Sequence, residues 1–391
     1  MKRHIAVIAV LVCLALFFVL YIMRGRLFLA NELNQPNELN QPEESMTDLA
    51  ETEDDTLHPD NPDDVDIAIR QHGYYPSTEQ ERQNLRKSYL LSRDGADAKI
   101  TLHVTDSNGR DVPSASVRVG FTVSDKKNTT MEGKTDGKGL FTAEGKTSYS
   151  VIYIVEKDGY YQTLIRDKVT LKNEADVKDG KWQPWNPTIK VILKEKQNPI
   201  PMYVKRINAR LPQKGETFGF DFKVGDLVAP HGKGKTADIL INCSGDKPIP
   251  LTLAVSRYLT LSWNNRNEGF VRKGRDLQSI FHSLYEAPDS GYEQEIKFCY
   301  RRTNDKILED NDFPKSEYLV FRTRVELDRG GKIVKANYGK IFDITFDIGS
   351  NDREDAAIRF LYYFNPAEND RNLEYDGKNN LLNPRDPHYA P

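Results

Sequence analysis

The segment 99–121, KITLHVTDSNGRDVPSASVRVGF, decides the fold class of this chain. Ile100, Leu102 and Val104 alternate with polar residues, a stretch rich in Asp, Ser, Asn and Gly follows, and the alternation resumes at Val117. A period of two is typical of a strand with one buried face, and the intervening residue types favour turns. The segment therefore predicts two β-strands joined by a loop.

The same pattern continues toward the C-terminus. A second turn signal, Asp-Gly-Lys-Gly, lies at 136–139, an apolar run follows at 151–155, and Val169 with Leu171 begins a further alternation. Short strands separated by Gly and Asp turns at this spacing are typical of a β-sandwich. We expect such a sandwich over residues 98–196.

Four motifs in this region carry a family resemblance: DSNGRDVP at 106–113, ASV at 115–117, TDGKGLF at 135–141 and KDGY at 157–160. In this order, they resemble the carboxypeptidase regulatory-like domain over about residues 98–172. That family is a transthyretin-like, seven-stranded β-sandwich, and bacterial invasin-type Ig repeats share the first half of the pattern. The resemblance implies a scaffold without an active site.

Catalytic and metal-binding motifs are absent from the sequence. The zinc peptidases that name the family use His-x-x-Glu, and none of the seven histidines is followed by Glu three residues later. There is no Gly-x-Ser-x-Gly elbow. His282 and Glu286 have helical spacing, which fits a surface contact better than a general base or a metal ligand. We therefore predict no catalytic residue, metal or cofactor.

The N-terminus predicts a membrane anchor within residues 1–30. An unbroken apolar run at 5–23 would rise about 28 Å as a helix, enough to cross the hydrocarbon core of a bilayer. Lys2 and Arg3 precede it, and Arg24 and Arg26 follow it. We expect an uncleaved, single-pass anchor with the N-terminus inside and the body in the periplasm or outer envelope space.

An acidic linker is expected at 31–69, which contains thirteen Asp or Glu, no Lys or Arg, and a repeated NELNQP hexapeptide. Such a composition favours a disordered, solvated tether. The remaining residues 70–391 carry a net charge of +6, which would favour anionic envelope polymers as partners or only keep the body soluble. Within 70–97, Ser77 and Gln80 predict the start of a short bracing helix, which ends at Gly95.

A polar loop at 179–187 contains Trp182 and Trp185. Two Trp residues in a Pro-containing loop would form a stacking platform for a sugar ring, or would cover a domain junction. The second arrangement is the more frequent one. A ligand site at Trp182 and Trp185 therefore stays a hypothesis.

Residues 197–391 predict a second β-rich domain that resembles no characterised family. Gln197–Pro201 indicates a stiff linker, and Arg329–Lys332 indicates a hairpin turn. Asp276–Glu286 predicts one docked amphipathic helix, with Leu277, Ile280, Phe281 and Leu284 on its apolar face. The expected strands are 218–224, 239–243, 249–255, 296–300, 318–327, 341–348 and 358–364.

Two chemical features of this domain leave alternatives open. Cys243 and Cys299 would form a disulfide in an oxidising compartment, or remain two buried thiols. The segment 231–236, HGKGKT, ends like a P-loop but lacks the first Gly and is followed by a strand pattern, so we expect a surface turn and no nucleotide site. No nucleic-acid motif is present.

These observations favour a membrane-anchored, non-catalytic binding or structural protein with an envelope polysaccharide or a protein as its partner. The alternative is an enzyme that acts on envelope glycans. Its site would use carboxylates such as Asp221, Asp226 and Asp310, which the sequence alone does not pair.

Overall fold

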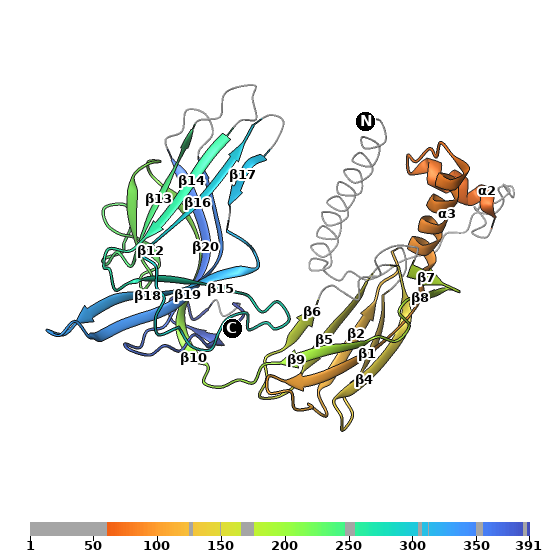
Figure 1. Cartoon of the computed structure of the whole chain (residues 1–391), viewed down its shortest axis with the longest axis horizontal. Coiled ribbons are helices and arrows are strands. Elements are labelled where there is room, and N and C mark those ends of the chain that lie inside the picture. Colours follow the sequence, from red (N-terminus) through yellow and green to blue (C-terminus); the bar gives the residue numbers. More distant parts are fainter. Residues whose placement is uncertain are drawn as a thin grey trace, which may run out of the picture. The chain divides into compact units, whose positions relative to one another are not determined.

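The computed structural model describes residues 61–124, 128–148, 150–165, 176–246, 255–303, 307–311, 313–348, 355–385 and 389–391. The anchor expected at 5–23 and most of the linker expected at 31–69 lie outside these residues. In the part described, no helix is both long and apolar enough to cross a bilayer. The described chain is mainly β-structure with two helices, and this confirms the mainly β part of the predicted fold class (Figure 1).

The first helix lies where the sequence predicted only disordered linker. Helix α2 spans Pro62–Gln71, and the Asn61 side chain accepts a hydrogen bond from the Asp63 N–H. Acidic residues in the first turn stabilise a helix N-terminus, so the charge that suggested disorder is compatible with this helix. The apolar residues Val65, Ala68 and Ile69 are buried. The linker prediction is therefore wrong for 62–69.

Helix α3 spans Glu79–Asp94 and begins one residue later than Ser77 would suggest. Its N-cap is Thr78, whose Oγ1 accepts a hydrogen bond from the Glu81 N–H at 3.2 Å. The Glu81 carboxylate accepts from both the N–H and the hydroxyl of Ser77 at 2.8 Å. The helix ends at Gly95, as expected, where φ is +67°.

The first β-module consists of two sheets that enclose one core. Five strands form one sheet: β1 (Ala96–Asp106), β4 (Leu140–Thr147), β7 (Val177–Lys178), β8 (Lys181–Trp182) and β9 (Thr188–Leu193). Four form the other: β2 (Ser116–Phe121), β3 (Thr129–Lys134), β5 (Val151–Glu156) and β6 (Thr163–Ile165). Alternate residues of β1, β2 and β5 fill the space between the sheets, as the period of two predicted. The strand expected at Val169 and Leu171 lies outside the described residues.

The two turns that carried the family resemblance are built by Asp side chains. Asp106 accepts from the N–H groups of Asn108 and Arg110 and from Nε of Arg110. Asp136 closes the second turn in the same way, and Gly139 adopts φ +70° there. A Cβ at Gly139 would lie 2.4 Å from a backbone oxygen of β1, so this position requires glycine.

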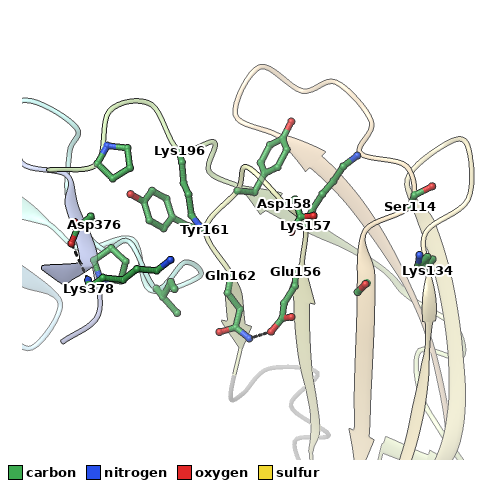
Figure 2. A pocket seen from close by; sticks show the side chains of 15 residues that line it. Ser114, Lys134, Glu156, Lys157, Asp158, Tyr161, Gln162, Lys196, Asp376 and Lys378 are labelled. Atoms are coloured by element: carbon green, nitrogen blue, oxygen red, sulfur yellow. Dashed lines mark hydrogen bonds between the residues drawn. The ribbon is translucent and has the colours of Figure 1, made fainter. Parts of the chain in front are cut away.

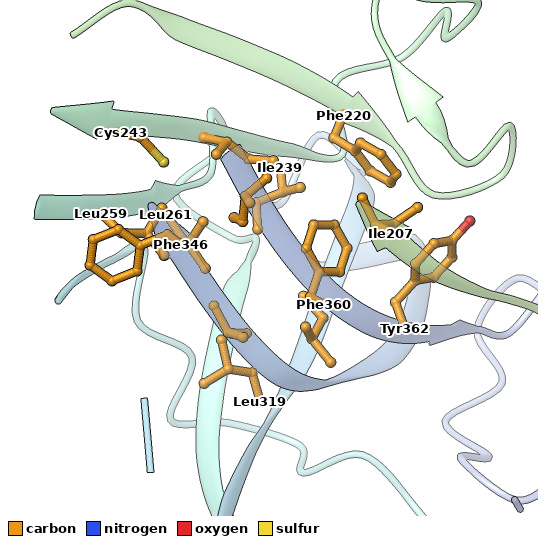
Figure 3. Packing of buried hydrophobic residues seen from close by; sticks show 14 of the residues in the cluster. Ile207, Phe220, Ile239, Cys243, Leu259, Leu261, Leu319, Phe346, Phe360 and Tyr362 are labelled. Atoms are coloured by element: carbon orange, nitrogen blue, oxygen red, sulfur yellow. The ribbon is translucent and has the colours of Figure 1, made fainter. Parts of the chain in front are cut away.

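The second module also consists of two sheets. The first contains β15 (Gly269–Gly274), β18 (Glu317–Leu327), β19 (Ile333–Ile348), β20 (Ala356–Phe364), β10 (Ile200–Leu211) and β21 (Tyr375–Asn380) in that order. The second contains β12 (Asp226–Leu227), β11 (Thr217–Asp221), β13 (Ile239–Asp246), β14 (Val255–Ser262), β16 (Glu295–Arg302) and β17 (Ile307–Asn311). An aromatic-rich core lies between them, with Phe220, Phe360 and Tyr362 in mutual contact (Figure 3).

The β10-containing sheet is buried on both faces. A second cluster, with Tyr318, Val320 and Tyr363, covers the face away from the main core. Strand β10 itself begins at Ile200, inside the segment that the sequence predicted as a linker. Pro199 and Pro201 flank that residue, which explains why the strand start was not recognised.

The helix predicted at Asp276–Glu286 does not exist. Residues 275–287, named here the junction loop, form bends and isolated bridges. Leu277 and Leu284, expected on a buried face, are 60% and 43% exposed, whereas Phe281 is fully buried. Helical periodicity was overridden because the loop pairs with the first module, through a bridge between Ser279 and Thr163.

Candidate functional site

An open groove of about 750 Å³ is lined by residues of both modules. Its walls come from the chain that follows β5, from Lys196 beyond β9, and from Asp376 and Lys378 on β21 (Figure 2). Ile280 of the junction loop also lines it. The groove therefore depends on segments that are far apart in the sequence.

One wall of the groove is the KDGY motif at 157–160. The Tyr160 N–H donates to the Lys157 carbonyl at 3.0 Å, and Gly159 adopts φ +82°. The Lys196 N–H then donates to the Gly159 carbonyl at 2.8 Å. This bond fixes the turn to the chain that leaves β9, so the same motif that indicated the family shapes the groove.

Tyr161 fixes the base of this region by contacting the second module. Its hydroxyl donates to Glu374 Oε1 at 2.7 Å, and its ring stacks on Phe281 with centroids 4.8 Å apart. Glu374 also accepts from the N–H groups of Gln197 at 2.9 Å and Asn198 at 2.6 Å. Burial, and next the bond to Glu374, raise the pKa of Tyr161 well above its usual value, so this hydroxyl stays protonated.

Four lysines line the groove: Lys134, Lys157, Lys196 and Lys378. Lys157 Nζ donates to a backbone carbonyl at 2.7 Å, and Lys196 Nζ lies 5.6 Å from the ring centroid of Tyr161. Across the described ranges, none of these ammonium groups forms a salt bridge. They remain available to an anionic ligand.

Two of the groove carboxylates are occupied by neighbouring groups. Glu156 accepts a hydrogen bond from the Gln162 amide (Figure 2). Asp376 accepts from the N–H groups of Lys378 at 2.9 Å and Asn379 at 2.8 Å. Burial alone would raise the pKa of Asp376, but these hydrogen bonds lower it, so the group is ionised within its own turn. The third groove carboxylate, Asp158, is exposed and lies beside the four lysines.

A second hollow of about 340 Å³ extends the groove over the outer face of β2, β3 and β5. The two hollows share Ser116, Lys134 and Glu156. Arg118 and Glu132 form an exposed salt bridge along the extension, at 2.7 Å. The combined surface is long and shallow, and polar and apolar atoms line it in about equal parts.

The two candidate ligand-binding tryptophans do not form a platform. Trp182 is 2% exposed within the first module's core, and its Nε1 donates to the Thr147 carbonyl at 2.9 Å. Trp185 is 38% exposed, with Lys181 Nζ 5.1 Å from its ring centroid. Only Trp185 offers a ring face to solvent, and it does not line the groove.

The strongest carboxylate pair of the second module is Asp221 and Asp238, which share Arg324. Arg324 donates to Asp221 at 2.9 Å and to both oxygens of Asp238 at 2.7 and 2.9 Å. Asp221 also accepts from four backbone N–H groups, at positions 223, 224, 235 and 236. Because protein donors occupy these oxygens, the pair serves as a structural anchor.

Burial acts differently on these two carboxyl groups. Burial would raise the pKa of Asp221, but the amide bonds and then Arg324 outweigh it and lower that pKa. For Asp238, burial dominates and raises the pKa in spite of Arg324. Glu268 is a third buried carboxyl whose pKa is raised by burial, and it accepts from the Val325 N–H at 3.0 Å.

Of the three carboxylates named for a possible enzyme, Asp221 and Asp226 are paired across β11 and β12, and Asp310 lies apart from them. Asp226 accepts from the N–H groups of Leu227 and Lys233 at 2.9 Å. Asp226 and Asp221 lie on β12 and β11 at one edge of their sheet, whereas Asp310 lies on β17 at the opposite edge. The side chain of Asp310 lies outside the described residues.

The P-loop-like segment 231–236 is a turn, and a strand follows it at Ile239. The N–H groups of Lys235 and Thr236 donate to Asp221 at 2.9 and 3.1 Å. Amides that would face a phosphate in a P-loop thus bind the chain's own carboxylate. The glycines are explained by close packing, because a Cβ at Gly232 would lie 2.3 Å from the Leu227 carbonyl oxygen.

His282 lies in the junction loop rather than on a helix. The predicted helical spacing between His282 and Glu286 is therefore wrong. Its Nδ1 lies 2.7 Å from the Asp276 carbonyl oxygen. Burial, as the largest cause, lowers the pKa of His282 below its usual value. Among the described residues no group of three His, Cys, Asp or Glu is arranged to hold a metal ion.

No disulfide joins Cys243 to Cys299. Cys243 lies on β13 and pairs with Leu259 of β14, whereas Cys299 lies on β16 and pairs with Tyr258 of β14. Two strand spacings, about 9–10 Å, exceed the reach of a disulfide. Burial raises the pKa of Cys243 to about 12, so this thiol stays protonated.

No protein-family model matches this chain, and no curated protein matches it. Solved structures give only distant similarities. A hydroxyquinol 1,2-dioxygenase from Pseudomonas putida is 14% identical over 26% of this chain and 58% of its own, with a TM-score of 0.20. A putative carbohydrate binding protein from Bacteroides uniformis is 10% identical over 68% and 99% of the two chains, with a TM-score of 0.17.

BcpA, the major pilin subunit of Bacillus cereus, is 10% identical over 67% of this chain and 95% of its own, with a TM-score of 0.17. This chain spans less than two thirds of the dioxygenase. Similarities at these TM-scores carry no argument about fold or function.

The groove was not found from the sequence because its lysines come from four separate segments. The only local signal was the KDGY motif, which we used only as part of the family resemblance of the first module. Tyr160 packs against the core of that module, but its neighbour Tyr161 faces the second module. The adjacent tyrosines 160 and 161 were a usable signal. Only one of them can pack into the core of the first module, so the other needs a different packing surface.

Proposed function

We propose that this chain is a non-catalytic, membrane-anchored binding protein of the cell envelope, and that its groove binds an anionic polysaccharide. The observation that carries the proposal is the groove of about 750 Å³, in which four lysines outnumber three carboxylates, two of them already occupied. A shallow surface that continues over β2, β3 and β5 suits an extended polymer better than a compact small molecule.

The charge of the body supports an anionic ligand. Residues 70–391 carry a net charge of +6, and the groove places four of the lysines on one surface. An ammonium and an anionic group about 4 Å apart in water attract each other by about 1 kcal/mol. Several such contacts would give weak, salt-sensitive binding of a repeating polymer.

The family proposal for the first module rests on its sequence motifs. We propose a carboxypeptidase regulatory-like, transthyretin-type sandwich at about 98–172, supported by the Asp106 and Asp136 turns and the KDGY motif. This family role is that of a scaffold. It agrees with a first module that supplies groove walls rather than a catalytic set.

The binding proposal is tested with the full-length chain and polygalacturonate, a polymer of uronic acid, with neutral dextran for comparison. Replacing Lys134, Lys196 and Lys378 together by Gln should weaken binding by at least about twentyfold, because each lysine contributes about fivefold. Binding of the wild type should also weaken as salt is added.

A matched control removes the same charge elsewhere. Lys146, Lys190 and Lys332 are exposed and do not line the groove, so their joint replacement by Gln should change the affinity by less than about twofold. Equal losses in both triple variants would reject the groove as the site. Equal binding of dextran would reject the choice of an anionic ligand.

Two further measurements test the rest of the proposal. The full-length chain should fractionate with membranes, and a soluble species that starts near Asn31 would contradict the uncleaved anchor. Turnover of a glycan that is abolished by replacing Asp221 or Asp226 would favour the enzyme and reject the non-catalytic function.

A further inference from the structure

Lys340 on β19 carries an amine that is fully buried beneath the junction loop. Its Nζ donates to the Ser283 hydroxyl of that loop at 2.9 Å. Aromatic rings occupy the remaining directions, with centroids at 4.7 Å for Tyr363, 4.9 Å for Phe281 and 5.8 Å for Phe342. The site holds an amine more readily than a fully charged ammonium.

No carboxylate forms an ion pair with Lys340 within the described ranges. A buried charge without such a partner is costly, and only the ring faces and one hydroxyl offset that cost here. Burial, and then repulsion from Lys194, lower the pKa of Lys340 to about 7, while Glu374 acts weakly in the opposite direction. Charging this amine therefore opposes the closed arrangement.

The first module holds the same loop from its other side. Lys194 Nζ donates to the carbonyls of Phe281 at 2.9 Å and Ser283 at 3.3 Å, and it pairs with Asp276 at 3.1 Å. The Ile280 N–H donates to the Gln162 carbonyl at 3.0 Å. The loop thus lies between a fixed contact in one module and Lys340 in the other.

We propose that the junction loop is a proton-sensitive latch, which closes over Lys340 as a neutral amine and opens when that amine takes up a proton. Because Ile280 lines the groove, opening would also remove part of a groove wall. That consequence rests on the proposed function, whereas the latch itself does not.

The direction of the pH effect follows from proton binding. In the open loop, Lys340 is in water and has the usual pKa of a lysine, so the open state binds more protons than the closed state above about pH 7. The closed state therefore gains stability as the pH rises, and the equilibrium constant for loop opening falls by at most tenfold per pH unit. Below about pH 7 both states are protonated, and this dependence ends.

Other titratable and charged groups lie on the loop or face it from neighbouring elements: Lys194, Glu195, Arg275, Asp276, His282, Glu286, Asp343, Arg371, Glu374, Tyr161, Tyr285, Tyr318 and Tyr363. Burial lowers the pKa of His282 below its usual value, and burial raises the pKa of Tyr285 and of Tyr318 to about 12. The pKa values of Tyr161 and Tyr363 are raised further by burial. These shifts leave Lys340 as the group expected to respond between about pH 7 and pH 9.

Hydrogen–deuterium exchange of the full-length chain tests the latch. Exchange of the loop amides is measured at about pH 7, 8 and 9 and corrected for the intrinsic chemical rate. The loop opening constant should fall by several-fold, and by at most about tenfold, for each unit of rising pH. A flat corrected profile in the wild type would overturn the proposal, whether or not any variant folds.

Two variants identify the responsible group. Lys340→Met keeps the length and apolar stem of the side chain, so its loop should stay closed with a flat profile. Lys194→Met should increase opening at every pH, because Lys194 binds loop carbonyls and contacts the Phe281 ring. It should keep a pH dependence, whose lower limit moves to higher pH because the repulsion that lowers the pKa of Lys340 is lost. A slope that persists in Lys340→Met, or disappears only in Lys194→Met, would assign the effect to another group.

Discussion

Arg324 is the residue on which the buried charges of the second module depend. It donates to both Asp221 and Asp238, whose side chains are 3% and 0% exposed. Arg324→Met would leave two buried carboxylates without their cation, and such a loss costs about 3–5 kcal/mol. We expect the urea midpoint at about pH 7 to fall accordingly.

The same variant has a predictable pH dependence. In the wild type the pKa of Asp221 is lowered, so its contribution to stability is present above the usual carboxyl pKa and lost as the pH falls through the folded value. Removing Arg324 raises the pKa of both carboxyl groups, and acid can then neutralise them. The destabilisation should therefore be smaller at about pH 5 than at about pH 7. Arg118→Met, which removes an exposed pair, should cost less than about 1 kcal/mol.

The two tryptophans predict opposite outcomes. Trp182→Ala removes a large buried ring and leaves the Thr147 carbonyl without its donor, so it should lower the free energy of unfolding by about 3–5 kcal/mol. Trp185→Ala should change it by less than about 1 kcal/mol because that side chain is 38% exposed. Equal effects in chemical denaturation would contradict the packing described here.

These residues show where sequence reasoning ends. Trp182 and Trp185 have the same local composition, and only the pairing of β8 with β1 decides which one is buried. Asp221 and Asp238 are likewise separated by a long turn, and their shared arginine comes from a distant strand. Spacing along the chain contains no signal for such contacts.

At the scale of elements, strands were easier to predict than their partners. The alternation in β1 and β2 and the apolar run that begins β18 identified these strands directly, and the β18–β19 hairpin turns at Asp328 and Gly331 as expected. Cys243 and Cys299 were both placed on strands, but only the order of β13, β14 and β16 shows that a strand separates them. Strand order depends on contacts between distant segments.

Helix α3 offers a direct test of which residue caps it. Thr78→Ala removes the acceptor for the Glu81 N–H, whereas Ser77→Ala removes only a hydroxyl that donates to the Glu81 carboxylate. Loss of a helix cap costs about 1 kcal/mol, so exchange of the first-turn amides should rise about fivefold in Thr78→Ala. A larger rise in Ser77→Ala would restore Ser77 as the cap.

At the scale of the whole molecule, the sequence indicated two β-modules but predicted a stiff linker between them. The structure instead has β9 and β10 separated by only a short segment, and Glu374 accepts N–H bonds from Gln197 and Asn198 within it. Glu374 comes from the far C-terminal part of the chain. Its carboxylate is only 1% exposed. No pattern in the sequence indicated this burial, because the groups that donate to Glu374 are a tyrosine hydroxyl and backbone amides.

Glu374 should therefore couple the unfolding of the two modules. Glu374→Ala leaves the buried Tyr161 hydroxyl and two part-buried N–H groups without their acceptor, and the loss of the buried bond alone costs about 1–3 kcal/mol. We expect calorimetry to show one transition for the wild type and two separated transitions for Glu374→Ala, because each module keeps its own core.

Tyr161→Phe provides the matched comparison, since it removes one of the three donors to Glu374 but keeps the ring stacked on Phe281. Its unfolding should remain a single transition, shifted by only a few degrees. A single, unshifted transition in Glu374→Ala would mean that this carboxylate does not link the modules. Two transitions in the wild type would mean that Glu374, Tyr161 and Lys194 together do not couple the unfolding of the two modules.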